Sequence, residues 1–325
     1  MRNLHPLCDH QPETQSLRTA ALDGLRRTPK KTSPKLFYDE RGSQLFDRIC
    51  QLDVYYPTRT EKAIMREHGG AMADALGANV LLVEYGSGSS SKTRILLDHL
   101  KDPAGYVPID ISREHLVEAA KQLAADYPEL PVLPVCADYT DAFDIPTPNG
   151  HITRIGAYFP GSTIGNFEVA DARAFLARIA DHIRPKGGLL IGVDLHKDPA
   201  ILEAAYNDPE GVTAAFNKNL LRRMNRELDA TFDVDRFRHQ AVYNETERRI
   251  EMYLVSTTDQ TVEVAGEDFS FHEGEPICTE YSHKYTFDSF ADLAGEAGLS
   301  VEKVWTDAEE LFSVQYCTVA DERAR

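Results

Sequence analysis

The hydrophobic positions of this chain follow a strand pattern from residue 80 onward, and helical segments lie between the strands. Val80-Leu-Leu-Val-Glu-Tyr is an almost continuous apolar run that ends at a glycine, which is typical of a parallel strand buried on both faces. Comparable apolar runs occupy residues 106–109, 132–135, 155–159 and 189–193. Strands that alternate with helices in this way predict an α/β fold with a doubly wound parallel sheet.

The helical segments are marked by apolar spacing and by capping residues. Thr58 and Glu61 have the spacing of a capping box, which predicts a helix that starts at this point. Asp198-Pro199 predicts a second helix start, with Asp198 as the N-cap. A final apolar run at 312–319 predicts a strand that returns to the sheet. Helical spacing is found at residues 43–50, 113–126, 170–183, 210–228 and 288–297.

The alternation of strands and helices breaks between residue 197 and about residue 285, which indicates an inserted α+β domain. We expect residues 20–60 to join residues 197–285 in this domain and to cover the substrate. Residues 61–196 and 286–325 then form the cofactor-binding domain. Residues 1–19 are polar and unpatterned, and predict a loosely attached tail.

The charge of the chain restricts its partners. The 325 residues carry a formal net charge of -17, which repels phosphate backbones and anionic membrane surfaces. The densest basic stretch, Arg222, Arg223 and Arg226, alternates with apolar residues and is interpreted as a solvated helix face. We therefore expect no nucleic acid and no membrane as a partner.

The cysteines and the apolar segments indicate the compartment. The five cysteines are scattered and form no Cys-x-x-Cys pair, so they predict reduced thiols rather than disulfides or a zinc site. Neither a signal-like run after Met1 nor a membrane-spanning stretch is present. We expect a cytoplasmic monomer without a metal.

A glycine-rich turn follows the strand that begins at Val80. In Glu84-Tyr-Gly-Ser-Gly-Ser-Ser-Ser, Gly86 and Gly88 allow a tight turn around Ser87 and a close approach of the backbone to a ligand, just before a helix. The sixth position of a dinucleotide fingerprint holds Ser91 rather than glycine or alanine, which disfavours NAD.

Acidic residues end three successive strands, at Glu84, Asp110 and Asp138. Ligands of open α/β sheets bind at these carboxyl ends, where Asp110 can grip ribose hydroxyls and Asp138 or its neighbours can contact adenine. Each acid alone could instead cap the following helix. Lys92 is either a surface lysine or a cation for a cofactor carboxylate.

Together, these residues resemble the Rossmann-like, seven-stranded class I methyltransferase fold. The resemblance implies that the glycine-rich loop wraps the amino-acid part of S-adenosylmethionine. The chain departs from that family by carrying serines where the loop often has a third glycine.

The segment Tyr158-Phe-Pro-Gly-Ser-Thr-Ile-Gly-Asn-Phe follows the fourth strand and places Asn166 in a loop that lies beside the transferred methyl group in this fold. An asparagine side chain can accept a hydrogen bond from an amine and donate one to a carboxylate. The alternative is an asparagine that only forms a turn.

Four stretches resemble the histidine Nα-methyltransferases of ergothioneine biosynthesis. They begin at Ser33 (Ser-Pro-Lys-Leu-Phe-Tyr-Asp-Glu-Arg-Gly-Ser), Asp53 (Asp-Val-Tyr-Tyr-Pro-Thr-Arg-Thr-Glu), Gly161 (Gly-Ser-Thr-Ile-Gly-Asn-Phe) and Ala204 (Ala-Ala-Tyr-Asn-Asp). The likeness extends from about residue 20 along nearly the whole chain. It implies transfer of three methyl groups to the α-amine of L-histidine, giving hercynine.

The resemblance also implies roles for individual residues. Tyr56 and Asn166 hold the α-amino group, Tyr38 and Tyr206 bind the carboxylate, and Tyr38, Tyr56 and Asn166 form the catalytic set. Glu280 and Ser282 bind the imidazole, and Met252 packs nearby, although Met252 alone reads as core. The cofactor is contacted by Tyr38, Gly86, Ser87, Gly88, Lys92, Asp110, Asp138 and Tyr139.

The chemistry of these residue types fits the implied reaction. Glu280 and Ser282 lie two residues apart on a predicted strand, so they point to the same face and can address both ring nitrogens. No lysine or histidine is placed as a base for the amine, so we expect Tyr38, Tyr56 or water to relay the proton. Adjacent Tyr55 competes with Tyr56 for the site.

Three alternatives remain open from the sequence. The chain could methylate the α-amine of another aromatic amino acid. It could be an NAD(P) oxidoreductase, although the chain has no convincing Tyr-x-x-x-Lys or His-acid pair and His196 is better read as structural. It could also be a cofactor-binding regulator without activity.

Overall fold

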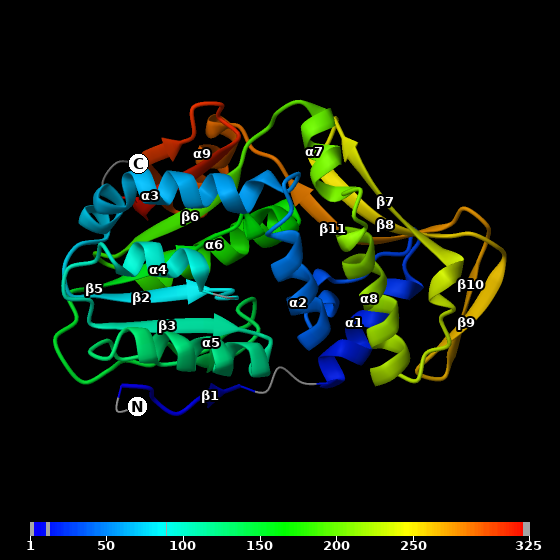
Figure 1. The fold of residues 1–325 in the computed structure, drawn as a ribbon, viewed down its shortest axis with the longest axis horizontal. Helices are drawn as coiled ribbons and strands as arrows, with labels where there is room; N and C mark the ends of the chain where they lie inside the picture. The colour runs from blue at the N-terminus through cyan, green and yellow to red at the C-terminus, as the bar shows by residue number, and fades with distance from the viewer. Residues whose placement is uncertain (1–2, 11–13, 89, 321–325) are drawn as a thin grey trace. The chain divides into compact units, whose positions relative to one another are not determined.

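The computed structural model describes residues 3–10, 14–88 and 90–320, and the chain divides into two compact units (Figure 1). The first unit comprises residues 1–11, 57–196 and 284–325, and the second comprises residues 12–56 and 197–283. The first unit is therefore interrupted twice, and the second is built from two stretches that are far apart in sequence.

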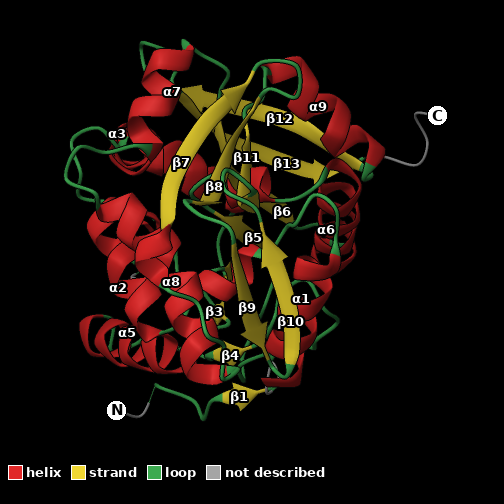
Figure 2. Ribbon diagram, turned by 90° about the vertical axis from the view of Figure 1, so that its right-hand side faces the viewer, coloured by secondary structure: helices red, strands yellow, loops and turns green. Residues whose placement is uncertain are grey.

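An eight-stranded sheet forms the centre of the first unit (Figure 2). In spatial order its strands are β1 (Cys8–Asp9), β4 (Val135–Cys136), β3 (Gly105–Asp110), β2 (Val80–Tyr85), β5 (Arg154–Phe159), β6 (Gly188–Asp194), β13 (Phe312–Val319) and β12 (Leu299–Thr306). The pairs are parallel except those of β13, which runs antiparallel to β6 and β12. The strand order reverses between β2 and β5, which is where ligands of such sheets bind. The predicted Rossmann-like α/β fold is confirmed, and β1 extends the seven expected strands to eight.

Helices cover both faces of this sheet. On one face lie α3 (Tyr56–Leu76), α4 (Ser91–Leu97) and α5 (Arg113–Asp126), and on the other lie α6 (Val169–Ile183) and α9 (Phe287–Glu296). Along β2, Leu82 packs toward the first group, whereas Leu81 and Val83 pack toward the second. This alternation explains why β2 reads as a continuous apolar run: it is buried on both faces.

Residues 3–10 do not form the loose tail that the sequence predicts. Cys8 and Asp9 pair with β4 at the edge of the sheet (Figure 2). The side-chain amide nitrogen of Asn3 lies 3.0–3.1 Å from three carbonyl oxygens at the C-terminal end of α5 and in the turn after it, which share its two N–H donors. Residues 1–2 and 11–13 of the predicted tail lie outside the described residues, and the chain is helical from Thr14.

The capping box predicted at Thr58 and Glu61 is wrong, whereas the helix start at Asp198 is confirmed. Helix α3 already begins at Tyr56, so Thr58 lies inside its first turn. Glu61 is fully buried and binds groups that are remote in sequence. Asp198, in contrast, accepts a hydrogen bond from the Ala200 N–H at 2.8 Å and caps its helix.

The second unit combines helices with two small antiparallel sheets (Figure 1). Strands β7 (Phe237–Asn244), β8 (Arg249–Ser256) and β11 (Pro276–His283) form one sheet, and β9 (Gln260–Val264) pairs with β10 (Glu267–Phe271). The helices are α1 (Thr14–Arg26), α2 (Glu40–Ile49), α7 (Pro199–Tyr206) and α8 (Val212–Glu227). Short 3-10 turns lie at Pro34–Phe37 (η1), Val234–Arg236 (η3) and, in the first unit, Thr163–Asn166 (η2).

All five cysteines are free, and three of them are buried. In the described ranges, no helix is long and apolar enough to span a bilayer.

Candidate functional site

The loop after β2 turns sharply at two glycines. Gly86 and Gly88 have φ angles of +74° and +48°, left-handed values that favour glycine. The N–H groups of Gly86 and Ser87 donate to the carbonyl oxygen of Ile109 at 2.8 and 3.1 Å, which fixes the loop against β3. The buried Ser87 hydroxyl has no hydrogen-bond partner among the described residues, and a Cβ atom built on Gly88 meets nothing within 4 Å. The loop therefore has room and an unused hydroxyl for a ligand; Ser89 lies outside the described residues.

Asp110 ends β3 and contacts this loop. Its carboxylate accepts hydrogen bonds from the N–H groups of Gly88 at 3.1 Å and Ser112 at 2.9 Å. Burial raises the pKa of Asp110, and the two backbone hydrogen bonds oppose that shift. Asp110 and the glycine loop are thus brought together at the carboxyl edge of the sheet, where the sequence predicts the cofactor.

Asp138 and Tyr139 follow β4 and take different positions. The Asp138 carboxylate accepts from the N–H and the hydroxyl of Thr140 at 2.9 and 2.6 Å, so it shapes a local turn. The Tyr139 ring lies 5.8 Å from that of Phe159, and its edge lies 3.6 Å from a Cβ atom built on Gly86. Tyr139 therefore lies beside the glycine loop.

Glu84 faces the interior of the unit and not the ligand edge. This buried carboxylate accepts hydrogen bonds from the hydroxyls of Thr93, at 2.6 Å, and Tyr106. Burial raises the pKa of Glu84 to about 7, although both hydrogen bonds and the nearby Lys92 lower it. Of the three acids at successive strand ends, Glu84 is therefore the one that serves the packing of β2.

Lys92 is paired with an acid that the sequence analysis assigned to a helix cap. Its ammonium lies 2.6 Å from the Glu61 carboxylate, and only 17% of the Lys92 side chain is exposed. A Cβ atom built on Gly161 would lie 3.1 Å from the same ammonium. Lys92, at the start of α4, therefore lies beside the loop after β5.

Asn166 ends the 3-10 turn η2 in that loop. Its side chain is half-buried, and its amide makes no hydrogen bond to another residue in the described part of the chain. The turn begins after Ser162, which has a left-handed φ of 59°. The loop thus leaves a side-chain amide with donor and acceptor capacity for a ligand.

Four candidate substrate residues come together in the second unit. Glu280 and Ser282 point to one face of β11, where Glu280 is paired in register with Met252 on β8. A register shift between Cys278 and Glu280 accompanies this arrangement. The Ser282 hydroxyl lies 2.8 Å from that of Tyr206, which ends α7. All four side chains are buried, with exposed fractions between 1% and 8%.

The adjacent residues Tyr55 and Tyr56 lie in two different environments. The Tyr55 ring lies 6.1 Å from that of Tyr206, and burial, followed by the charges of Tyr206 and nearby groups including Glu280, raises the pKa of Tyr55. Tyr56 instead accepts a hydrogen bond of 2.8 Å from the Lys197 ammonium, which also lies 4.5 Å from its ring centre. Sequence reasoning missed Lys197, since 141 residues separate it from Tyr56.

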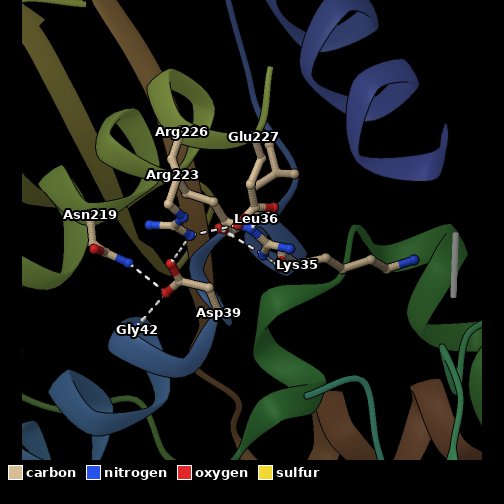
Figure 3. A network of polar contacts seen from close by, with 8 residues as sticks. All are labelled: Lys35, Leu36, Asp39, Gly42, Asn219, Arg223, Arg226 and Glu227. Carbon is tan, nitrogen blue, oxygen red and sulfur yellow. Dashed lines mark hydrogen bonds and ion pairs between the residues drawn. The ribbon is translucent and has the colours of Figure 1, made fainter. Parts of the chain in front are cut away.

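A polar network at the start of α2 surrounds Asp39, the residue that follows Tyr38 in the sequence (Figure 3). Adjacent Asp39 caps α2 by accepting from the Gly42 N–H at 2.6 Å, and it also binds Asn219 and Arg226 of α8. The Tyr38 ring itself packs edge-on against aromatic rings of α2 and α8.

The basic stretch of α8 is therefore more than the solvated face that its sequence predicts. Arg226 lies 2.6 Å from the Asp39 carboxylate, and Arg223 donates to the carbonyl oxygens of Lys35 and Leu36 at 3.3 and 3.2 Å (Figure 3). These contacts attach the segment that carries Tyr38 to α8.

Across residues 3–10, 14–88 and 90–320, no group of three or more His, Cys, Asp or Glu side chains is arranged to hold a metal ion.

Known proteins are similar to this sequence along most of its length. The chain is 43% identical over 299 residues to a histidine N-alpha-methyltransferase of Mycolicibacterium smegmatis, covering 90% of this chain and 92% of the relative. It is 42% identical to a histidine N-alpha-methyltransferase of Mycobacterium tuberculosis, covering 90% and 91% of the two chains. It is 34% identical to ergothioneine biosynthesis protein 1 of Neurospora crassa, covering 87% of this chain and 32% of that protein.

A family profile gives the same assignment. The profile described as histidine-specific methyltransferase, SAM-dependent, matches residues 17–319, which include most of both units and every candidate residue named above. The chain belongs to the family of histidine-specific, S-adenosylmethionine-dependent methyltransferases.

Proposed function

We propose that this enzyme transfers three methyl groups from S-adenosylmethionine to the α-amine of L-histidine, which yields hercynine in the first step of ergothioneine biosynthesis. The observation that carries the choice of histidine is the buried pair Glu280 and Ser282 on one face of β11. A carboxylate and a hydroxyl that share a face can bind both nitrogens of an imidazole, whereas a purely hydrocarbon ring offers neither group a hydrogen bond.

The first unit has groups that suit the cofactor. When bound, S-adenosylmethionine supplies a methyl group on an electrophilic sulfonium carbon. The glycine loop would hold its amino-acid part through Gly86, Ser87 and Gly88, and the unpartnered buried hydroxyl of Ser87 supports this assignment. Lys92 would bind the cofactor carboxylate, and Asp110 the ribose. Asp138 and Tyr139 would border the adenine, and Tyr38 would complete the cofactor contacts.

The remaining candidates would bind histidine. Tyr56 and Asn166 would hold the α-amino group and direct its lone pair, since an in-line displacement depends mainly on position. Tyr38 and Tyr206 would bind the carboxylate. Met252 lies opposite Glu280 and would pack against the imidazole.

Each round of transfer requires a neutral amine, so a proton must leave. Tyr56 is the residue we propose for this step, directly or through water, with Tyr38 as the alternative route. The Tyr56 oxygen accepts a hydrogen bond from Lys197, and a positive charge at this distance stabilises negative charge on the phenol oxygen.

We also propose that the enzyme acts as a cytoplasmic monomer without a nucleic-acid partner. The net charge of -17 disfavours phosphate backbones. Size-exclusion chromatography with light scattering would test the oligomeric state.

The test of the function uses the purified chain, S-adenosylmethionine and an equimolar mixture of the twenty amino acids, with products identified by mass spectrometry. Trimethylated histidine is the expected dominant product. In Glu280→Gln, kcat/KM for histidine should fall about ten- to hundredfold, because a hydrogen bond to a charged group is lost. Dominant methylation of another aromatic amino acid would refute the choice of histidine, and no methylated amino acid would refute the proposed reaction.

A further inference from the structure

Glu61 on α3 is a fully buried carboxylate with three close contacts inside the first unit. Both of its oxygens lie 3.0 Å from the backbone nitrogen of Gly161, and one lies 2.6 Å from the Lys92 ammonium. Its side chain has 0% exposure. A buried charge is costly unless it is paired and hydrogen-bonded, so these contacts are strong constraints on the groups around Glu61.

The sheet leaves space for this carboxylate at one glycine. A Cβ atom built on Gly192 of β6 would lie 2.4 Å from a Glu61 carboxylate oxygen and 3.0 Å from the Gly161 nitrogen. Any larger residue at position 192 would therefore push the carboxylate and the Gly161 backbone apart. Close packing at Gly192 is thus required for the contact between Glu61 and Gly161.

A second anchor follows immediately along the loop. The Ser162 hydroxyl accepts a hydrogen bond of 2.8 Å from the N–H of Asp194 at the end of β6. The Asp194 carboxylate lies 2.7 Å from the Lys284 ammonium, and both side chains are buried. Two consecutive residues, Gly161 and Ser162, are therefore fixed directly before the turn that ends at Asn166.

We propose that Glu61 is a positioning residue for methyl transfer: by holding Gly161, it sets the turn that presents Asn166 to the amino group of histidine. This inference rests on the proposed function, because it uses the role given there to Asn166. In this role Glu61 touches neither substrate nor cofactor and acts through the loop.

The contact with Lys92 gives the proposal a specific signature. If Lys92 binds the cofactor carboxylate, Glu61 and that carboxylate share one ammonium, and their like charges repel each other. Loss of the Glu61 charge should then leave cofactor binding intact or strengthen it, while the loosened loop weakens the use of histidine. A residue that only stabilised the fold would weaken both together.

The experiment compares Glu61→Gln with the wild type in two measurements. The dissociation constant of S-adenosylhomocysteine, by calorimetry, should remain within about threefold of the wild-type value or decrease, because the competing anion is gone. The kcat/KM for histidine should fall about ten- to hundredfold, because one oxygen of the anchor is replaced by a donor that cannot accept from the Gly161 N–H.

A second variant moves the loop but keeps the charge. Gly192→Ala should reproduce the loss in kcat/KM for histidine, and it carries the test if Glu61→Gln does not fold. Glu67→Gln is the matched control, because Glu67 lies on the same helix with 75% of its side chain exposed. This control should behave as the wild type in both measurements.

The outcomes separate the inference from the function. A wild-type enzyme that does not methylate histidine would overturn the proposed function and this inference with it. If the wild type is active, wild-type kcat/KM in both Glu61→Gln and Gly192→Ala would overturn the inference alone. A parallel loss of S-adenosylhomocysteine affinity and histidine turnover would also overturn it, in favour of a purely structural role.

Discussion

Lys197 donates a hydrogen bond of 2.8 Å to the Tyr56 oxygen, and its ammonium lies 4.5 Å from the ring centre. The adjacent cation stabilises negative charge on this oxygen and therefore favours the phenolate form of Tyr56. A phenolate oxygen can take a proton from an amine and become the neutral hydroxyl. The contact joins two residues whose sequence neighbourhoods give no sign of it.

Replacement of this lysine should affect turnover more than substrate binding. In Lys197→Met, kcat should fall about tenfold, with a smaller change in the KM for histidine, because one charge-assisted hydrogen bond is lost. Lys197→Arg should recover part of the rate, and the exposed Lys186→Met should have no effect. Steady-state kinetics would measure kcat and the KM for histidine in each variant. An unchanged kcat in Lys197→Met would exclude Lys197 from the proton route.

Glu84 predicts a pH dependence of stability. Burial raises its pKa from 4.5 to about 7, so the folded protein holds this proton more tightly than the unfolded chain does. The contribution of Glu84 to stability is therefore full below pH 4.5 and declines as the pH rises toward about 7. In Glu84→Gln this decline should be absent. Between pH 4.5 and about pH 7, the free energy of unfolding of the variant should therefore change by roughly 1–3 kcal/mol less than that of the wild type. Urea unfolding of both proteins at several pH values measures the difference, and parallel curves would contradict it.

Among the elements, the attachment of α2 to α8 depends on one carboxylate. Burial raises the pKa of Asp39, but hydrogen bonds from Gly42, Arg226 and Asn219 outweigh this effect and lower the pKa below its ordinary value (Figure 3). A lowered pKa gives stability that is present above the unfolded-state pKa and is lost as the pH falls through the folded-state value. The contact between these helices should therefore weaken in acid.

The variant Arg226→Met tests this contact. It should lower the free energy of unfolding by about 1 kcal/mol at neutral pH, a small effect because the Arg226 side chain is half-exposed and the pair is partly screened. It should also reduce the loss of stability in acid, because Asp39 then lacks one of the groups that lower its pKa. Arg222→Met is the control, since Arg222 is exposed on the same helix and makes no ion pair among the described residues. Equal unfolding midpoints for the two variants would speak against the contact.

Elements with a strong period could be predicted from the sequence, and those fixed by remote partners could not. Helix α5 spans the predicted residues 113–126, and β2 and β13 also match their predicted ranges. Strand β1 has two residues and no period of its own; it exists because β4 offers an unpaired edge. Strand β12 was not predicted, because its charged positions weaken the apolar pattern.

The same distinction applies to the candidate site. The rule that ligands bind at carboxyl ends of strands correctly brings Asp110 to the glycine loop, yet it cannot show that Glu84 turns inward toward Tyr106. Glu61 fits a local capping pattern, but its partner Gly161 lies 100 residues away. Local chemistry was therefore a sound guide to residue type and a poor guide to nonlocal pairing.

At the scale of the whole molecule, the net charge of -17 acts differently on the two forms of the cofactor. S-adenosylmethionine carries one positive charge overall near neutral pH, whereas S-adenosylhomocysteine, without the sulfonium, is neutral overall. A strongly acidic protein therefore attracts the methyl donor over distances up to the Debye length and has no such attraction for the product. The net charge therefore favours association of S-adenosylmethionine and does not hold back the release of S-adenosylhomocysteine.

This difference should appear as a dependence on salt. Raising the ionic strength from about 0.01 M to about 0.1 M shortens the Debye length from about 30 Å to about 10 Å, so the long-range attraction is screened. We expect kcat/KM for S-adenosylmethionine to fall several-fold over this range, while the inhibition constant of S-adenosylhomocysteine and the KM for histidine, which is nearly neutral, change little. Equal salt dependence for donor and product would show that local contacts, and not the field of the acidic surface, govern cofactor association.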